Sequence, residues 1–562
     1  MSRLKAVGWL AALMGAGLLL RLPQLRLGLW RDEASTYFDV VPATLGAMIH
    51  TVATCELNPP GFFLIMRQWV HVFGAGDVAF KVPALLFGLS MIPAAYLLGS
   101  TAGSRATGLI AAGFATFAPQ AVYFSQEARP YSLAALLCCC TGVAFLKALR
   151  GRYALRDLAW FVVWASLFVY VQYTGLLVVV ALAIAAAGIA LRRESGVRWI
   201  PLGLAFAAIG LLFAPWLPTF LIHLRTGTPW AQSVPLAQMG ALFVHNVLYT
   251  IPLAGVPRSL LLAGVLAGAI AMIATHSRAS TDRVAHAPIL LLVVVAVLIG
   301  LETALSFGGR YLFPLAPLAW VLYAQFALDL WHRMNRVALH SVLRVALRVS
   351  VTGLVAWSLV VPGVKRALSR DPLPKSGIRS LAADLDRSPL QSTVLVVAPD
   401  YLGPTFGYYG ARSQTAPFYG FARWDRPQLF TPGDYAAIWN NPAVVFYTER
   451  RIHEEAVLGA RSLALVWEDA PARLGRMPFG KTQELVAALS RTYALRKQVT
   501  YRGTQESVTL SVFSLGPQRQ VRPESGAAVP PRRPAPGHQR PSNPRLTQGV
   551  LSSPARVAAP FP

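Results

Sequence analysis

Two adjacent acids, Asp32 and Glu33, follow the first apolar segment of the chain in the stretch LWRDEASTY (29–37). A carboxylate in this place can take the proton of a hydroxyl group as that hydroxyl attacks a substrate, which is general base catalysis. Two neighbouring carboxylates cannot point into the same hydrogen bond, so we expect them to have different roles. The same pair would also suit the N-terminus of a helix, where the helix dipole favours acidic side chains. The two residues alone leave both interpretations open.

Two arginines could complement these acids. Arg129 lies two residues before Tyr131, and Arg310 lies directly before Tyr311, each beside an apolar segment. An arginine can stabilise the negative charge that develops on an anionic leaving group such as a phosphate. The alternative is that each side chain simply extends its charge to the membrane surface, or that Arg129 pairs with Glu127.

The elements that must position these residues are apolar. Hydrophobic residues make up 55% of the 562 residues and charged residues only 14%, with a mean hydropathy of +0.48. No soluble globular class combines this length with so little charge, so we expect an integral membrane protein. A helix that crosses the membrane needs about 20 apolar residues. Segments close to that length predict about eleven spans, at 6–22, 79–100, 106–124, 131–149, 158–173, 175–191, 199–220, 257–275, 287–306, 311–330 and 344–362.

The basic residues set the expected orientation. The formal charge is +26, and most basic residues before residue 375 fall in short loops between spans, where the positive-inside rule places them in the cytoplasm. This holds if residues 58–74 form a helix at the membrane interface and not a span. The N-terminus is then cytoplasmic, and residues 22–78 and all residues after 362 lie outside a cell (inner) membrane. The charge therefore indicates membrane topology, and no nucleic-acid partner is expected.

The character of the chain changes after residue 374. Residues 375–518 alternate short mixed segments, which predicts a small extracytoplasmic α/β domain. SGIRSLAADLDR (376–387) predicts a helix, and STVLVVAP, PAVVFYT, SLALVWED and VTLSVFSL predict strands. The aromatic stretch YLGPTFGYYG (401–410) is either a contact for a sugar or lipid headgroup or a strand-to-helix loop. Residues 519–562 are rich in proline and arginine and predict a disordered tail.

Six stretches in chain order resemble the motif series of bacterial glycosyltransferase family 39 membrane enzymes. These are LWRDEASTY (29–37), the segment from NPPGFF to LLFG (58–88), FSQEARPYSLAAL (124–136), VQYTGLL (171–177), APWLP (214–218) and RYLFPLAP (310–317). Such enzymes belong to the GT-C superfamily, with protein O-mannosyltransferases and lipid A aminoarabinose transferases as relatives. The likeness runs across about residues 1–375.

The resemblance implies a polytopic α-helical membrane protein of GT-C type with an extracytoplasmic C-terminal α/β domain. Residues 1–374 would form the transmembrane glycosyltransferase domain, with its first external loop at 22–78. The implied activity is transfer of a sugar from a polyprenyl-phosphate donor to a lipid, glycan or protein acceptor, among membrane lipids. The sequence does not name the sugar, the prenyl length or the acceptor.

The resemblance also suggests roles for individual residues. Asp32 would be the general base, and Glu33 would position the acceptor. The residues expected to contact substrate are Arg129, Arg310, Tyr131, Tyr311, Asn58 and Glu127. Relatives often carry His or Lys immediately before the Pro-Pro pair, where this chain has Asn58.

Two other functional classes remain to be weighed. A transporter or flippase of lipid-linked sugars would be expected to show repeated halves or charged, broken helices in the membrane, and the sequence shows no internal repeat. An assembly or export subunit would leave the Asp32–Glu33 pair without a role. No cofactor is required by the sequence, and no pair of histidines has metal-ligand spacing. We name no metal ligand, although a divalent metal stays open.

Overall fold

The computed structural model describes most of the first 516 residues. The described ranges are 2–150, 154–190, 199–227, 235–249, 287–304, 309–334, 341–368, 373–387, 392–410, 418–421, 428–433 without 430, 441–468 and 479–516, with a few positions between 257 and 270. The predicted tail 519–562 lies outside them, as does most of the predicted span 257–275. Residues Met1–Leu515 form one compact unit.

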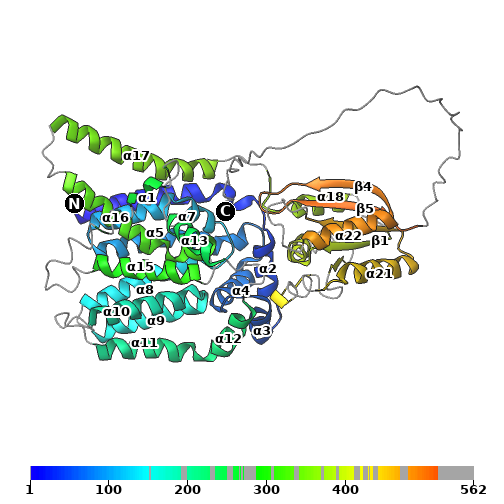
Figure 1. The fold of residues 1–562 in the computed structure, drawn as a ribbon, viewed down its shortest axis with the longest axis horizontal. Coiled ribbons are helices and arrows are strands. Elements are labelled where there is room, and N and C mark those ends of the chain that lie inside the picture. The colour runs from blue at the N-terminus through cyan, green and yellow to red at the C-terminus, as the bar shows by residue number, and fades with distance from the viewer. Residues whose placement is uncertain are drawn as a thin grey trace, which may run out of the picture. The chain divides into compact units, whose positions relative to one another are not determined.

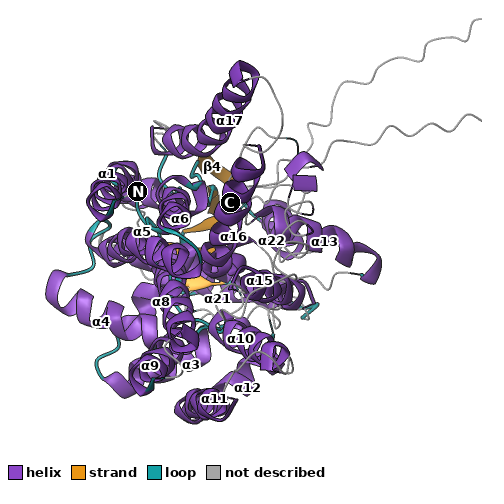
Figure 2. Cartoon of the chain, turned by 90° about the vertical axis from the view of Figure 1, so that its left-hand side faces the viewer, coloured by secondary structure: helices purple, strands orange, loops and turns teal. Residues whose placement is uncertain are grey.

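Apolar helices build the first part of this unit (Figure 1). The long ones are α1 (Arg3–Arg21), α5 (Val82–Ala102), α6 (Arg105–Phe117), α8 (Tyr131–Arg150), α9 (Leu155–Val171), α10 (Thr174–Ala190), α11 (Trp199–Phe213), α15 (Ala287–Ala304), α16 (Ala316–Met334) and α17 (Ser341–Leu368). Each predicted span other than 257–275 overlaps one of these helices; 106–124 also includes α7 (Pro119–Phe124), and 199–220 continues past α11 into the helix at 217–226. Figure 2 views several of them, such as α5, α6, α8 and α9, nearly end-on.

Within the described residues, five helical stretches are long and apolar enough to cross a membrane. They are Arg3–Arg26, Ala79–Ala102, Tyr131–Arg150, Ile200–Thr226 and Gly309–His332. The expected multi-pass helical class is therefore confirmed. The count of about eleven spans stays a prediction.

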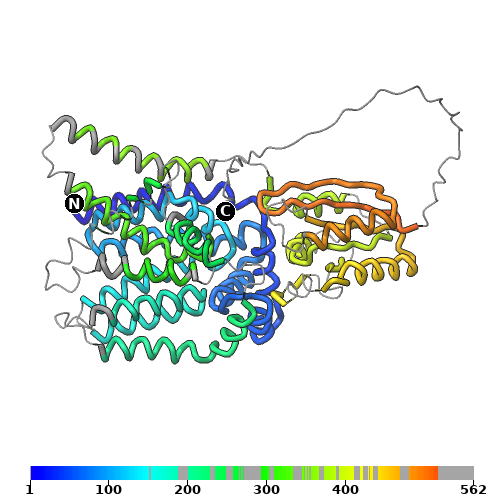
Figure 3. The backbone as a smooth tube through the Cα atoms, viewed as in Figure 1, coloured from blue at the N-terminus to red at the C-terminus, as the bar shows by residue number. Residues whose placement is uncertain are grey.

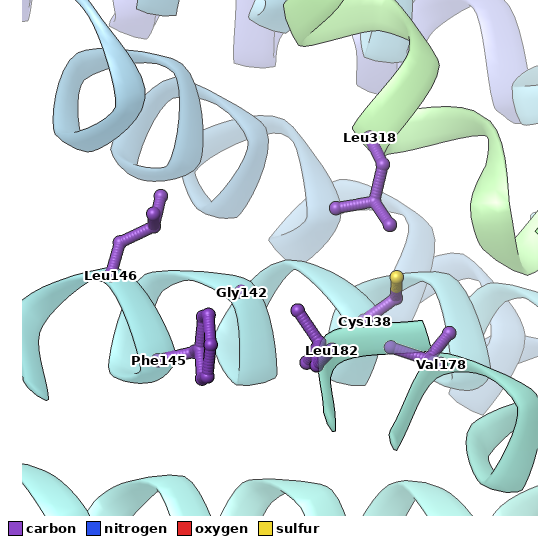
Figure 4. A pocket seen from close by; sticks show the side chains of 7 residues that line it. All are labelled: Cys138, Gly142, Phe145, Leu146, Val178, Leu182 and Leu318. Carbon is purple, nitrogen blue, oxygen red and sulfur yellow. The ribbon is translucent and has the colours of Figure 1, made fainter. Parts of the chain in front are cut away.

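Small residues let these helices approach closely. A Cβ atom added at Gly99 of α5 would lie 2.8 Å from the Cα atom of Gly108 in α6, so the two backbones touch at a position where only glycine fits. An apolar pocket lies among α8, α10 and α16, lined by Cys138, Gly142, Phe145, Leu146, Val178, Leu182 and Leu318 (Figure 4). Its lining carries no charged side chain, so it belongs to the packing of the helices and not to a sugar or phosphate site.

Short helices form the loop that the sequence predicts to be the first external one. They are α2 (Arg31–Val40), α3 (Leu45–Cys55), α4 (Gly61–Phe73) and the 3-10 turn η2 (Ala79–Lys81). The predicted interfacial segment 58–74 corresponds to α4, whose buried residues Phe62, Phe63 and Met66 line one face. Two further helices, α12 (Leu217–Thr226) and α13 (Leu236–Tyr249), and the turn η4 (Gly309–Leu315) follow later in the chain.

The C-terminal part is a five-stranded sheet with the order β2-β1-β3-β5-β4. The strands are β1 (Thr393–Ala398), β2 (Phe418–Gly420), β3 (Ser462–Trp467), β4 (Ala494–Tyr501) and β5 (Val508–Ser514). β1 pairs in parallel with β2 and β3, and β5 pairs antiparallel with both β3 and β4. In the register of β1 and β3, Leu395 lies opposite Ala464. The predicted small α/β body is therefore present.

Both faces of the sheet are buried. On β1, Val394, Val396 and Ala398 join a core with the helices α21 (Val444–Val457) and α22 (Phe479–Thr492). The alternate residues Leu395 and Val397 belong to the main core, because successive strand side chains point to opposite faces. That second face meets α18 (Ile378–Arg387) and α19 (Gly403–Gly410), which follows the turn η5 (Asp400–Leu402). The domain boundaries predicted from the sequence remain a proposal.

One predicted strand is wrong. PAVVFYT (442–448) lies mostly in helix α21. Its two adjacent valines, at 444 and 445, had favoured a strand. Val444, Thr448 and Ile452 are the buried residues of α21, and this spacing of four is helical. The predicted helix at 376–387 and the other three predicted strands agree with α18, β1, β3 and β5. The strand β4 was missed because it is largely exposed and polar.

Candidate active site

The acidic pair lies in the first turn of α2. This helix begins after Gly28, whose φ of 78° is readily adopted only by glycine. Trp30 is the residue at the N-cap and gives no side-chain hydrogen bond to the helix. Both acids therefore occupy the positive end of the helix dipole. Their side chains nevertheless have different surroundings.

Asp32 faces arginines. Its carboxylate accepts a hydrogen bond from the guanidinium of Arg310 in η4, and Arg31 Nε lies 3.7 Å from its other oxygen. The Asp32 side chain keeps 17% of its surface exposed and that of Arg310 keeps 33%. Burial would raise the pKa of the Asp32 carboxyl, but the charges of Arg310, Arg129 and Arg31 outweigh burial and lower it to about 2. Asp32 is thus an ionised, accessible carboxylate beside a partly exposed cation.

Glu33 is enclosed. Its side chain has no exposed surface, and Lys375 Nζ lies 2.8 Å from one carboxylate oxygen. The backbone N–H of Ala128 donates to the other oxygen at 2.9 Å. Because both oxygens are occupied inside the protein, this geometry argues against the acceptor-positioning role that we predicted. We reassign Glu33 to holding α2 in place.

Arg129 pairs with Glu56 and not with Glu127. Its two terminal nitrogens reach the two carboxylate oxygens of Glu56 at 2.6 and 3.0 Å. Arg129 also donates to the carbonyl oxygen of Asp32 and to the hydroxyl of Thr36, each at 3.1 Å. The side chain is buried, so it does not extend to a lipid surface. It ties the end of α3 to the first turns of α2.

The remaining predicted residues surround this cluster. Asn58 donates to Glu56 at 3.2 Å. Glu127 is buried and accepts hydrogen bonds from Trp30 Nε1 at 2.8 Å and the hydroxyl of Tyr123 at 3.4 Å. Tyr131 is buried at the start of α8, and Tyr311 lies under the guanidinium of Arg310, 5.4 Å from its ring centre.

Glu127 has unused hydrogen-bonding capacity. Its second oxygen, Oε2, has no partner among the described residues. Burial raises the pKa of its carboxyl, so this group favours the protonated form more than an ordinary glutamate. The open oxygen of this buried carboxyl leaves room for a hydrogen bond with a substrate, which is compatible with the predicted place of Glu127 in a binding site.

Sequence reasoning missed three charged residues of the site, Asp39, Glu56 and Lys375, and gave Lys81 only as a weaker candidate for a phosphate contact. Burial and the neighbouring Glu56 carboxylate raise the pKa of Asp39 well above its usual value. Lys81 Nζ donates to the carbonyl oxygen of Gly28. The scarcity of acids before residue 375 could have pointed to Asp39 and Glu56, since both lie in the first external loop. Nothing local marks Lys375, because its partner is 342 positions away in the sequence.

Metal ligands were not predicted, and a divalent metal was left open. In the part of the chain that the structure describes, no three side chains of His, Cys, Asp or Glu are grouped as a metal site.

Comparison with known proteins supports the predicted class. The family profile of dolichyl-phosphate-mannose-protein mannosyltransferase matches residues 57–219, which is less than a third of the chain. A comparison with curated protein sequences found no match.

Solved structures match over much more of the chain. One is ArnT from Cupriavidus metallidurans bound to undecaprenyl phosphate, with a TM-score of 0.52 and 12% identity, covering 91% of this chain and 99% of that one. Another is the apo oligosaccharyltransferase of Archaeoglobus fulgidus, with a TM-score of 0.56 and 12% identity, covering 82% of this chain and 70% of that one. A third is the oligosaccharyltransferase AglB from Archaeoglobus fulgidus in complex with an inhibitory peptide and a dolichol-phosphate, with a TM-score of 0.51 and 13% identity, covering 83% of this chain and 70% of that one.

These matches confirm the GT-C fold that the motif series predicted. The fold extends through the C-terminal sheet, since the match to ArnT spans nearly all of both chains. Together, the family match and the fold support a membrane glycosyltransferase.

Proposed function

We propose that the protein transfers a sugar from a polyprenyl-phosphate donor to an acceptor on the extracytoplasmic face of the cell membrane, an inner membrane where the cell has two. The observation that carries this proposal is the pairing of a partly exposed carboxylate, Asp32, with a partly exposed guanidinium, Arg310. The first can serve as a base and the second can hold a phosphate. Two proteins of similar fold were solved with undecaprenyl phosphate and with a dolichol-phosphate, which are donors' lipid phosphates without the sugar.

The proposed reaction has one transfer step. The acceptor hydroxyl oxygen bonds to the anomeric carbon of the sugar, and the bond from that carbon to the phosphate oxygen breaks. The polyprenyl phosphate leaves with the bonding electron pair, and the acceptor proton goes to the Asp32 carboxylate. Arg310 stabilises the charge that develops on the phosphate, through a two-pronged contact that lysine cannot reproduce.

The ion pair between Arg310 and Asp32 connects these two roles. While Arg310 binds Asp32, the carboxylate is a weak base, with its pKa at about 2. A donor phosphate competes for the same guanidinium, and its own negative charge opposes that of Asp32. Arrival of the donor would therefore make Asp32 a stronger base at the moment when a base is needed.

The experiment that tests the proposal is incubation of the detergent-purified protein with a set of radiolabelled polyprenyl-phosphate sugars. We expect release of polyprenyl phosphate from at least one donor, together with label in an acceptor or in water. Asp384→Asn serves as the matched control, because Asp384 is an exposed aspartate of α18 paired with Arg387. Absence of release from every donor, by protein that binds polyprenyl phosphate and carries it across vesicles, would favour the transporter alternative.

A further inference from the structure

The segment that leads into α2 is held by the C-terminal sheet region, by which we mean the five strands and the described residues around them from 373 to 515. The backbone N–H of Lys375 donates to the carbonyl oxygen of Leu27 at 2.7 Å, and Arg379 donates to the carbonyl oxygen of Arg26 at 2.8 Å. The hydroxyl of Tyr409 in α19 accepts from the N–H of Leu29 at 2.7 Å. Residues 26, 27 and 29 thus each bond to the sheet region through a backbone group.

The sheet region also caps α2 itself. Trp30 provides no side-chain cap, so the first N–H groups of the helix need partners from elsewhere. Glu506, in the hairpin between β4 and β5, accepts from the N–H of Arg31 at 3.0 Å. The end of this hairpin, in orange, lies beside the blue segment that contains α2 in the tube of Figure 3. Glu506, which is 475 positions away from Arg31 in the sequence, therefore acts as the N-cap of α2.

Lys375 adds a buried charge contact two residues further along the same turn. Its ammonium donates to Glu33 at 2.8 Å and to the carbonyl oxygen of Gln126 at 3.1 Å, and only 6% of its side chain is exposed. Gln126 leads into α8 and Glu33 belongs to α2, so one ammonium connects three separate segments. Loss of one partner from such a buried pair leaves an uncompensated charge, which strongly disfavours the existing arrangement.

The backbone at Lys375 is itself hydrogen-bonded to the hairpin between β4 and β5. The carbonyl oxygen of Lys375 accepts from the N–H of Gln505 at 2.8 Å, and the N–H of Gly377 donates to the carbonyl oxygen of Glu506 at 2.8 Å. Lys375 and Glu506 therefore move together, and both contact the first turn of α2. Asp32 lies between their two contact points, Arg31 and Glu33.

We propose that the C-terminal sheet region positions the transferase site, with Lys375 as its principal positioning residue. Through Lys375 and the cap from Glu506, it sets the direction of the first turn of α2, so that Asp32 faces Arg310 while Glu33 points inward. The C-terminal sheet region would then contribute to sugar transfer, a role that rests on the proposed function. It places no residue of the sheet region in contact with substrate.

Backbone hydrogen exchange in the full-length protein tests the positioning role without any substrate. In Lys375→Met, we expect exchange of the amides in residues 27–34 to rise by about tenfold or more, since that segment loses its anchor. Exchange in β1 should stay within about twofold of wild type, because the sheet itself is intact. Lys481→Met is the matched control, since Lys481 forms an exposed pair with Glu484.

The double variant Glu33→Gln with Lys375→Met distinguishes charge pairing from simple loss of packing. It removes both charges, so no buried carboxylate is left unpaired, and exchange in residues 27–34 should return part of the way toward wild type. Tyr409→Phe is a milder second variant, which should raise exchange mainly at Leu29. If Lys375→Met does not accumulate, the double variant and Tyr409→Phe still decide the question. Unchanged exchange in residues 27–34 in all three variants would overturn the proposal, as would an equal rise in β1.

Transfer kinetics then link position to activity. With a radiolabelled undecaprenyl-phosphate sugar that the wild type uses, Lys375→Met should lower kcat by about tenfold or more, while KM for the donor changes by less than about threefold. Unchanged kcat in a variant with loosened residues 27–34 would contradict the positioning role. If the wild type itself uses no donor, the proposed function fails, whereas the exchange result still decides whether the sheet region holds α2.

Discussion

The neighbouring carboxylates of Asp32 and Glu33 have opposite environments. Asp32 keeps an accessible face toward arginines, and Glu33 is enclosed with Lys375. The sequence could predict that the pair would divide its roles, because adjacent side chains on a helix point in different directions. It could not predict which residue is enclosed, since the partners of Glu33 come from positions 128 and 375. The pairing of Arg129 with Glu127, which the sequence left open as an alternative, is not the one found, because the partner Glu56 comes from a different helix.

The contact between Arg310 and Asp32 leads to a pH prediction. The pKa of Asp32 lies below its usual value of 3.8 because of the arginines, so protonation of Asp32 should not limit wild-type kcat/KM above about pH 4. In Arg310→Met the largest of the charges that lower this pKa is lost, while burial, which raises it, remains, so the acid limb of kcat/KM should move to higher pH. Transfer rates measured from pH 4 to pH 8 check this, with Arg387→Met as the control. An acid limb at the same pH in Arg310→Met and wild type would show that Arg310 does not set the basicity of Asp32.

At the scale of elements, the cap from Glu506 predicts a pH-dependent stability. Burial raises the pKa of this carboxyl to about 7; Arg31 opposes the shift and Glu468 adds to it. A carboxyl with a raised pKa holds its proton in the folded state when the unfolded chain has released it. Its contribution to the free energy of unfolding is therefore greatest below about pH 4.5 and is lost as the pH rises through about 7. The whole effect is a few kcal/mol at most, since one pKa unit corresponds to about 1.4 kcal/mol.

Thermal unfolding of the purified protein between pH 5 and pH 8 measures this contribution. Wild type should lose more stability than Glu506→Gln over this interval, because the glutamine can accept the same backbone hydrogen bond but cannot ionise. Glu454→Gln, at an exposed glutamate of α21, is the control and should follow wild type. Parallel curves for wild type and Glu506→Gln would mean that Glu506 titrates in its ordinary range. Local sequence could not have revealed this cap, because Glu506 and Arg31 are 475 positions apart. It did reveal α18, β1, β3 and β5, because the pattern of apolar residues in each element is complete within a few residues.

At the scale of the whole molecule, the sequence predicted the class of fold from hydropathy and an ordered series of motifs, and solved structures confirm the GT-C fold. Hydropathy was sufficient here because a membrane helix must satisfy its own backbone hydrogen bonds and expose apolar side chains. The strand mistakenly predicted at 442–448 shows the limit of such reasoning. Its valines are few enough to fit either element, and packing of α21 on the sheet decided the outcome.

Membrane orientation supplies a further prediction at this scale. We expect Ala154 to lie on the cytoplasmic side, and Ala47 and Ser490 on the outer side, from the positions of the basic loops. All three residues are exposed, so cysteine at each can react when a reagent reaches it. In a background without the native cysteines, an impermeant maleimide added to intact cells should label positions 47 and 490 only. Labelling of position 154 before permeabilisation would reverse or break the proposed topology.

We propose above that Asp32 removes the acceptor proton during transfer from a polyprenyl-phosphate sugar. The most direct test is donor binding and transfer measured separately on Asp32→Asn, which keeps the size of the side chain and removes its basicity. We expect transfer to fall by roughly 10²–10⁴-fold while the donor still binds, with Asp384→Asn close to wild type. Wild-type transfer by folded Asp32→Asn would contradict the account and leave the accessible carboxylate of α2 without a catalytic role.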